Sequence, residues 1–269
     1  MFDRSSPFLE RPAAVARLPA AQPKADFAAD RLRDAILSCQ LMPGQTVSEQ
    51  DLCERFQLGR AGIRNALAQL SASGLVEALA RKGWRVSPIT PQQIRDLCAA
   101  RRGLEPALLD GAHSTKETGR LAHLASVIET LRGQREQAAM LTARRYDREF
   151  LETLAEGGNI WIGRWLAEAW DGSARVVAFF EKTSAARLPV WSRVALVEAL
   201  QRGDLAAAAS EIDRSAAHFE AFVTEALLSL PIALSASAGG RRKRADAMSK
   251  RRSSATGTKP VIDQNGEIE

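Results

Sequence analysis

The sequence predicts a mainly α-helical chain built from a small N-terminal part and a larger all-helical part. Apolar residues recur at helical spacing from about residue 25 to 74 and again from about 91 to 230. Between these stretches, residues 75–89 alternate apolar and polar side chains around a Lys82-Gly83 turn, which is typical of a β-hairpin. No strand-like alternation follows the hairpin, so we expect the second part to be an antiparallel helical bundle.

Charge is distributed unevenly along the 269 residues. Residues 1–90 carry 12 Lys and Arg against 9 Asp and Glu, residues 91–234 carry 17 against 19, and residues 235–269 carry 8 against 4. The basic excess at the ends favours an anionic partner such as nucleic acid, although charge alone also fits an ordinary soluble domain. No apolar run is long enough to span a bilayer and no secretory leader pattern is present, so we expect a cytoplasmic protein without a membrane partner.

Breaks in composition divide the chain into four segments. We expect a disordered arm over residues 1–23, a DNA-binding domain over 24–90, a helical domain over 91–232, and a basic disordered tail over 233–269. The tail is either a solvated end or an extra source of phosphate affinity. Three cysteines lie among apolar neighbours and are predicted to be buried, reduced thiols: Cys39, Cys53 and Cys98.

The N-terminal part begins with two helices that have clear signals. The first runs over about residues 25–40, and its expected buried stripe consists of Ala28, Leu32, Ala35, Ile36 and Cys39. Pro43-Gly44 interrupts the pattern. Ser48 is the expected N-cap of the next helix, with Asp51 completing a capping box, and this helix ends near Phe56.

The third helix, from about Arg60 to Ser73, has one buried and one polar face. Its buried stripe is predicted to be Ile63, Ala66, Leu67 and Leu70, and Gly74 is its stop signal. Arg60, Ala61, Arg64 and Asn65 lie away from that stripe. A helix with this polar face can enter the DNA major groove, where Arg contacts guanine or phosphate and Asn contacts adenine.

Three helices followed by a basic hairpin have the element order of a winged helix-turn-helix. The hairpin supplies Arg81, Lys82 and Arg85, and Gly83 permits close backbone approach to sugar or phosphate. Arginines on one helix can also form a simple solvated face, but the neighbouring basic hairpin favours DNA binding. The candidate DNA-contacting residues are Ser48, Arg60, Ala61, Arg64, Asn65, Arg81, Lys82 and Gly83.

The segment "LMPGQTVSEQDLCERFQLGRAGIRNALAQLSASGLVEALARKGWRV" resembles the DNA-binding domain of GntR-type bacterial transcription regulators. The resemblance implies that Arg60 and Arg64 read DNA and that Gly83 is the wing glycine. The sequence departs from the family pattern at several polar positions. Gly59 replaces a serine, Ala61-Gly62 replaces Thr-Pro, and Asn65 replaces a glutamate. These changes imply an altered operator sequence.

The helical part resembles the FadR-type (FCD) effector domain of the same family. "IRDLCAARRGLEPALL" is similar to its opening helix, and "DREFLETLAEGGNIWI" and "SRVALVEALQRGDLAAAASEIDRSAAHF" are similar to later motifs. Many such domains bind a divalent metal through one Asp and three His. Here the Asp corresponds to Asp147, whereas Leu151, Arg193 and Ser215 replace the histidines, so we expect the metal to be lost and no cofactor to be needed.

The resemblance also implies a site for a small, anionic, organic-acid-type effector. Its candidate residues are Arg101, Asp147, Arg193 and Ser215, with Arg193 replacing the metal as positive charge and pairing with Asp147 when the site is empty. Arg193 near a helix start can instead be exposed. Two other groups of residues have ordinary structural roles as their expectation. His113, His123 and His218 are expected to be structural or solvent-exposed, and Trp161 and Trp165 to pack in the core or at a dimer interface.

The sequence therefore predicts a transcription regulator, and a repressor in particular, that binds a palindromic operator as a homodimer. An alternative is a DNA-bound architectural or scaffolding regulator whose effector site is degenerate. The motifs HExxH, G-x-S-x-G, P-loop and CxxC are absent, so we do not expect an enzyme.

Overall fold

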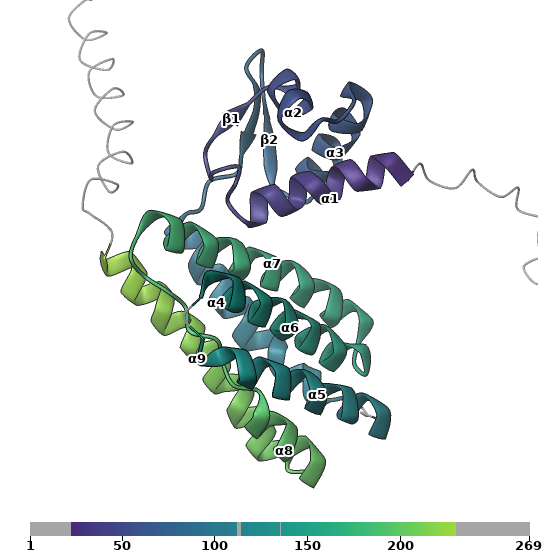
Figure 1. The fold of residues 1–269 in the computed structure, drawn as a ribbon, viewed down its shortest axis with the longest axis vertical. Coiled ribbons are helices and arrows are strands. Elements are labelled where there is room, and N and C mark those ends of the chain that lie inside the picture. The colour runs from purple at the N-terminus through teal and green to yellow at the C-terminus, as the bar shows by residue number, and fades with distance from the viewer. Residues whose placement is uncertain (1–22, 112–113, 135, 230–269) are drawn as a thin grey trace, which may run out of the picture. The chain divides into compact units, whose positions relative to one another are not determined.

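The computed structural model describes residues 23–111, 114–134 and 136–229. The predicted tail over 233–269, all but the last residue of the predicted arm, and His113 lie outside the described residues. The elements follow the expected order (Figure 1): α1 (Pro23–Leu37), β1 (Thr46–Val47), α2 (Glu49–Phe56), α3 (Arg60–Ala72), β2 (Val76–Leu79), β3 (Gly83–Val86), α4 (Pro91–Leu104), η1 (Glu105–Leu109), α5 (Thr115–Arg132), α6 (Gln137–Glu156), α7 (Ile160–Thr183), α8 (Val194–Arg202) and α9 (Leu205–Ser229). The predicted fold class is confirmed.

Capping signals in the sequence correctly mark the starts and ends of the first helices. Ser48 caps α2. Its side-chain oxygen accepts the Asp51 backbone N–H, and its own backbone N–H donates to the Asp51 carboxylate. Gly59 caps α3 without a side-chain hydrogen bond, and Gly74 beyond its end has φ +71°. All five residues of the expected first stripe are buried, although α1 ends at Leu37 and Cys39 follows it with φ +53°.

The sheet differs from the expected two-stranded hairpin. It has three antiparallel strands in the order β1-β3-β2, because Thr46 and Val47 pair with Arg85 and Trp84. A two-residue strand is too short to produce a readable alternation, so its pairing could not be predicted. The strand β3 also ends at Val86 rather than near Ile89, and Gly83 lies within it rather than in the turn.

Every regular element in the described residues beyond Pro91 is helical. The helix α4 is followed at Glu105 by a 3₁₀ helix, next to Pro106, which cannot donate a helical hydrogen bond. The helix α8 begins at Val194, after an extended loop. Helices α5 and α6 lie side by side, as do α4 and α7 (Figure 1).

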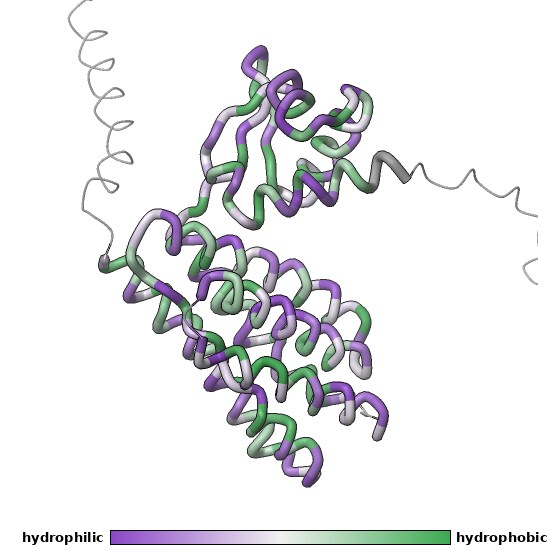
Figure 2. The backbone as a smooth tube through the Cα atoms, in the orientation of Figure 1, coloured by the Kyte–Doolittle hydropathy of each residue, from purple (hydrophilic) through white to green (hydrophobic). Residues whose placement is uncertain are grey.

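Buried apolar residues form two separate cores, one in each part. The N-terminal core joins α1, α2, α3 and the sheet through residues such as Leu32, Leu67 and Val86. The second core includes Phe150, Leu154 and other residues of the bundle. Hydrophobic and hydrophilic residues alternate along most of the helices in Figure 2, as expected for elements that bury one face.

Two further expectations concern membranes and thiols. None of the helices in the described residues combines the length and hydropathy needed to cross a membrane. All three cysteines are free thiols, but only Cys39 is fully buried, while Cys53 and Cys98 are half-buried.

Candidate nucleic-acid interface and buried arginine cluster

One face of α3 is polar and open to solvent. Its opposite face buries Ile63, Ala66, Leu67 and Leu70, which fixes the rotation of the helix. This rotation leaves Arg60, Ala61, Arg64 and Asn65 exposed. Arg60 is the first residue of the helix, so its guanidinium lies at the N-terminal end, where backbone N–H groups also favour an anion.

Arg64 is not free on this face. Its Nε donates to Glu49 Oε2 on α2 at 2.7 Å, while the Arg64 side chain stays 68% exposed. The hydrogen bond that Arg64 donates to Glu49, together with the charge of that carboxylate, raises the pKa of Arg64 above its ordinary value. A phosphate or base contact by Arg64 therefore competes with an existing carboxylate partner.

The turn between β2 and β3 carries Arg81 and Lys82, and both side chains are exposed. Arg81 has φ +61°, a value that the short turn imposes. Gly83 follows with φ +85°, and a Cβ at this position would lie 2.6 Å from the Val47 carbonyl oxygen. Gly83 is therefore required by the packing of the sheet itself, independently of any approach to DNA.

Two other candidate residues have internal partners. The Ser48 hydroxyl accepts the Asp51 backbone N–H at 3.1 Å, so its first role is to cap α2. Arg85, on β3, pairs with Glu77 on β2 at 2.5 Å. By contrast, no ion pair of Arg60, Arg81 or Lys82 occurs within the described residues. The face of α3 and the adjacent turn together present cations suited to phosphate and to guanine edges.

A buried arginine cluster lies inside the helical part. Arg193, directly before α8, is 3% exposed, so the alternative of an exposed Arg193 is wrong. Its Nε and Nη2 donate to the two carboxylate oxygens of Asp147 on α6, at 2.6 and 3.2 Å, as the sequence predicted for this pair. Its Nη1 donates to Ser215 Oγ on α9 at 3.0 Å. Arg193 thereby links three elements.

The electrostatics of Arg193 reflect two opposing effects. Burial disfavours the charged guanidinium and acts to lower its pKa, but the charge and hydrogen bonds of Asp147 outweigh burial and hold the pKa above its ordinary value. The guanidinium also lies over the Phe150 ring, 5.6 Å from its centroid. Arg193 is thus a buried guanidinium that stays positively charged because the Asp147 carboxylate pairs with it.

Arg101, the other expected cation of this site, has a separate partner. It is 8% exposed and its Nε donates to Glu105 Oε1 at 2.6 Å, an oxygen that also accepts from Trp170 Nε1 at 2.9 Å. Its guanidinium lies over the ring of Phe219, one turn beyond Ser215 on α9. Glu105 and Trp170 were not among the residues expected at this site, although a carboxylate four residues after an arginine is a recognisable pairing signal.

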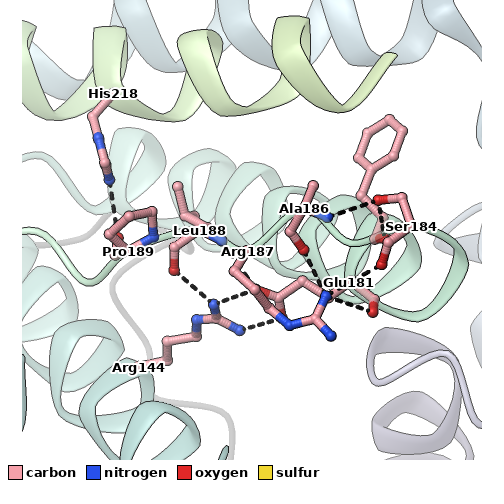
Figure 3. A network of polar contacts seen from close by, with 9 residues as sticks. Arg144, Glu181, Ser184, Ala186, Arg187, Leu188, Pro189 and His218 are labelled. Carbon is pink, nitrogen blue, oxygen red and sulfur yellow. Dashed lines mark hydrogen bonds and ion pairs between the residues drawn. The ribbon is translucent and has the colours of Figure 1, made fainter. Parts of the chain in front are cut away.

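The loop that leads to Arg193 is held by a second arginine fork (Figure 3). Arg144 on α6 donates through Nη1 and Nη2 to the two oxygens of Glu181, and Nη2 also donates to the Leu188 carbonyl. Glu181 in turn accepts the Leu188 backbone N–H. His218 Nε2 lies 2.9 Å from the Pro189 carbonyl oxygen, which ties the same loop to α9. These contacts fix the backbone that positions Arg193.

The residues around Asp147 do not fit a divalent metal. Leu151 is buried and offers no ligand atom, Arg193 places a cation where a metal would lie, and Ser215 Oγ accepts from that cation. His218 faces Pro189 and packs against Trp191 in a tilted arrangement, with 4.9 Å between ring centroids, instead of completing a site with Asp147. Among the residues that the structure describes, no three His, Cys, Asp or Glu side chains converge on one point.

Ion pairs continue from this cluster toward the N-terminal part. Arg148 follows Asp147 on α6, and its Nη1 lies 2.9 Å from Asp171 Oδ1 on α7. The other oxygen of Asp171 accepts from Arg33 on α1 at 3.2 Å. Of these two neighbouring residues of α6, Asp147 therefore binds Arg193. Arg148 binds Asp171, which also binds Arg33 on α1.

A surface groove on the described part of the chain lies away from this cluster. It has a volume of about 490 Å³, lies between α5 and α8, and is lined by residues such as Glu129, Val194 and Glu198. None of the four candidate effector residues lines that groove. Within the Arg193–Asp147 pair, the Asp147 side chain is the more accessible, at 24% exposed against 4% for Arg193.

Comparisons with known proteins concern both parts of the chain. The model of the family described as bacterial regulatory proteins, gntR family, matches residues 24–86. The chain is 26% identical over 210 residues to an uncharacterized HTH-type transcriptional regulator of Streptomyces ambofaciens, covering 73% of this chain and 88% of the relative. It is 31% identical over 83 residues to the HTH-type transcriptional repressor RspR of Escherichia coli strain K12, which is 31% of this chain and 36% of RspR.

Two solved structures resemble the fold over most of its length. A GntR-type structure from Rhodococcus sp. RHA1 has a TM-score of 0.60 at 21% identity and covers 78% of this chain and all of its own. The structure of E. coli McbR/YncC has a TM-score of 0.62 at 12% identity and covers 76% of this chain and 99% of its own. At these identities the likeness concerns the fold alone.

Proposed function

We propose that this chain, whose residues 24–86 match the gntR family model, is a GntR-type transcription regulator that binds a palindromic operator as a homodimer through α3 and the β2–β3 turn. The observation that carries the proposal is the exposed face of α3, where Arg60, Arg64 and Asn65 surround the small Ala61. Small residues let the helix backbone approach the major groove, and the flanking cations supply base and phosphate contacts. The chain is a regulator and not an enzyme.

Repression is the proposed sign of regulation. RspR and GlaR of E. coli, both described as repressors, share 31% and 32% identity with this chain over 83 and 78 residues. A dimer on a palindrome spans two recognition helices about one DNA turn apart and can block polymerase at a promoter. DNA binding of this kind would take place in the cytoplasm.

DNA binding can be tested with fluorescence anisotropy on the DNA upstream of the protein's own gene. We expect wild-type protein to bind this DNA more tightly than a shuffled sequence, and Arg64→Ala to lose about tenfold or more, because a bidentate base contact contributes about 1–3 kcal/mol. Arg145→Ala is the matched control, since Arg145 is an exposed arginine of α6 in the helical part. Equal binding by wild type and Arg64→Ala would contradict the proposed role of α3.

We further propose that the helical domain is of the FadR type and responds to a small organic-acid-type anion at Arg101, Asp147, Arg193 and Ser215. The chemical basis is exchange of carboxylates: an incoming acid takes the place of Asp147 on the Arg193 guanidinium. Release of Asp147 would disturb Arg148, its neighbour, and so the Arg148–Asp171–Arg33 contacts. The effector would thereby shift the dimer between DNA-competent and incompetent states.

A specific observation favours the second candidate, a DNA-bound architectural regulator with a degenerate effector site. Arg193 already has partners on every guanidinium nitrogen, since Nε and Nη2 bind Asp147 and Nη1 binds Ser215. A buried cation that already has a partner on each nitrogen has less to gain from an external anion.

Thermal-shift screening of small organic acids and sugar acids separates the two candidates. A functional site predicts that at least one acid raises the melting temperature of the wild type and leaves that of Arg193→Met unchanged. The architectural alternative predicts no shift that depends on Arg193, together with operator binding that no acid alters.

A further inference from the structure

The groove between α5 and α8 is lined by small apolar side chains from both helices, which lie side by side (Figure 1). Ala122 and Ala125 contribute from α5, and Val194 and Val197 contribute from α8. The two residues of each pair are three positions apart and therefore share a helix face. Its volume of about 490 Å³ lies within the range of about 300–1,000 Å³ that small-molecule sites have. We call it the α5–α8 groove.

The two walls of the groove are held in place by the core of the bundle. On its other side α5 buries Leu121, Leu124 and Ile128, and α8 buries Leu196 and Ala199. These contacts fix the rotation of both helices. A ligand would therefore meet a preformed surface and would not have to order it first.

The charged residues that line the groove are both acidic. Glu129 on α5 and Glu198 on α8 line it, and no described lysine, arginine or histidine does. Two arginines stand beside these carboxylates: Arg132 lies 3.1 Å from Glu129 Oε1, and Arg202 lies 3.9 Å from Glu198 Oε2. All four side chains are at least 41% exposed, so water weakens both pairs. The groove itself is therefore complementary to a cation.

One carboxylate oxygen of the groove residues needs a donor. Glu129 Oε2 is buried and has no hydrogen-bond partner among the described residues, although Oε1 accepts from Arg132. Buried polar atoms without a partner are rare in native proteins, because they lose their water without a replacement. An ammonium N–H from a bound molecule would supply the missing hydrogen bond, and its charge would strengthen that bond.

We propose that the α5–α8 groove binds a small organic cation, an amine with an apolar body of several carbons. The ammonium group donates to Glu129 Oε2 and is attracted by Glu198, while the apolar body covers the alanines and valines. Both carboxylates repel an anion, and a neutral compound leaves Glu129 Oε2 without a charged donor. This site is separate from the proposed effector site, none of whose residues line the groove.

Calorimetric titration of the full chain at neutral pH tests the charge of the ligand. The probe is hexylamine, which is an ammonium ion at this pH, and hexan-1-ol and hexanoate are matched compounds with the same carbon chain. We expect hexylamine to bind at least about tenfold more tightly than either compound, because only hexylamine forms a charge-assisted bond to a carboxylate. No binding of hexylamine, or binding of hexan-1-ol or hexanoate at equal strength, would overturn the proposal.

Variants of the groove test where the amine binds. Glu129→Gln is expected to weaken hexylamine binding about tenfold and Glu198→Gln a few-fold. Glu168→Gln is the matched control, because it removes an exposed carboxylate of α7 that does not line the groove, and it should bind like wild type. Ala122→Trp fills the groove and should abolish binding. Unchanged affinity in Glu129→Gln would overturn the proposal, and this variant decides the matter if Ala122→Trp does not fold in circular dichroism melts.

A lysine side chain of another protein carries the same ammonium group, so a third titration uses N-acetyl-lysine methylamide. Tighter binding of this compound than of hexylamine would assign the groove to a protein partner and overturn the small-molecule proposal. Weaker binding supports it. These titrations contain no DNA, and Arg64→Ala should bind hexylamine like wild type. Failure of this proposal is therefore distinguishable from failure of the proposed DNA binding.

Discussion

Two arginines of the N-terminal part and two of the helical part have opposite environments. Arg60 and Arg81 in the N-terminal part are exposed and form no ion pair within the described residues. In the helical part, Arg193 and Arg101 are 3% and 8% exposed, and each is bound to a carboxylate. Water solvates an exposed guanidinium well, so this group can stay unpaired until an external anion binds. A buried guanidinium needs a carboxylate partner within the protein. Exposure, and not residue type, separates cations available for DNA from cations used to hold helices together.

The largest effect is expected from breaking the buried pair on one side only. Asp147→Leu leaves Arg193 as an uncompensated buried cation and should lower the free energy of unfolding by about 3 kcal/mol, the lower end for such pairs because Asp147 is partly exposed. Urea denaturation followed by circular dichroism measures this change.

The double variant Asp147→Leu/Arg193→Met is the control for that prediction. It removes both charges and replaces them with apolar groups of similar size, so we expect stability within about 1–2 kcal/mol of wild type. If the double variant is as unstable as Asp147→Leu, the loss comes from packing and not from the unpaired cation.

The exposed cations predict a different signature, in salt dependence rather than stability. Arg81→Ala/Lys82→Ala should leave the melting temperature unchanged but reduce the slope of log K against log salt for DNA binding by about 0.9 per lost phosphate contact, or about 1.8 in total. Titrations at several salt concentrations measure the slope. An unchanged slope would mean that the β2–β3 turn does not contact phosphate.

A smaller effect is expected where an arginine has both an internal partner and an exposed position. Glu49→Gln frees Arg64 from its 2.7 Å bond and removes a negative charge near the DNA, so we expect affinity to rise a few-fold. Glu54→Gln is the matched control, because it removes the same charge from α2 without touching Arg64. A fall in affinity for Glu49→Gln alone would show instead that Glu49 positions Arg64.

No effect at all is expected from divalent metals on the helical domain. Zinc or nickel should not raise the melting temperature of wild-type protein, and a chelator should not lower it, because Arg193 and Leu151 replace ligands beside Asp147. A metal-dependent shift that Asp147→Leu abolishes would contradict this account of the buried cluster.

Local signals in the sequence were sufficient for most of the N-terminal part. The capping box of Ser48 and Asp51 and the buried stripe on α3 depend on contacts within a few residues, so periodicity and capping chemistry reveal them. The pairing of Thr46 and Val47 with β3 joins residues almost forty positions apart and leaves no local pattern, which is why the third strand was missed.

The buried network shows the same limit in the helical part. The sequence alone determined that an arginine, a leucine and a serine stand where a metal-binding domain has histidines, and that α7 carries tryptophans four residues apart. Only the tertiary structure decided that Arg193 is buried against Asp147 and that Trp161 and Trp165 face solvent. The reason is that helical periodicity fixes which residues share a face, whereas the packing of distant helices decides whether that face meets the core or water.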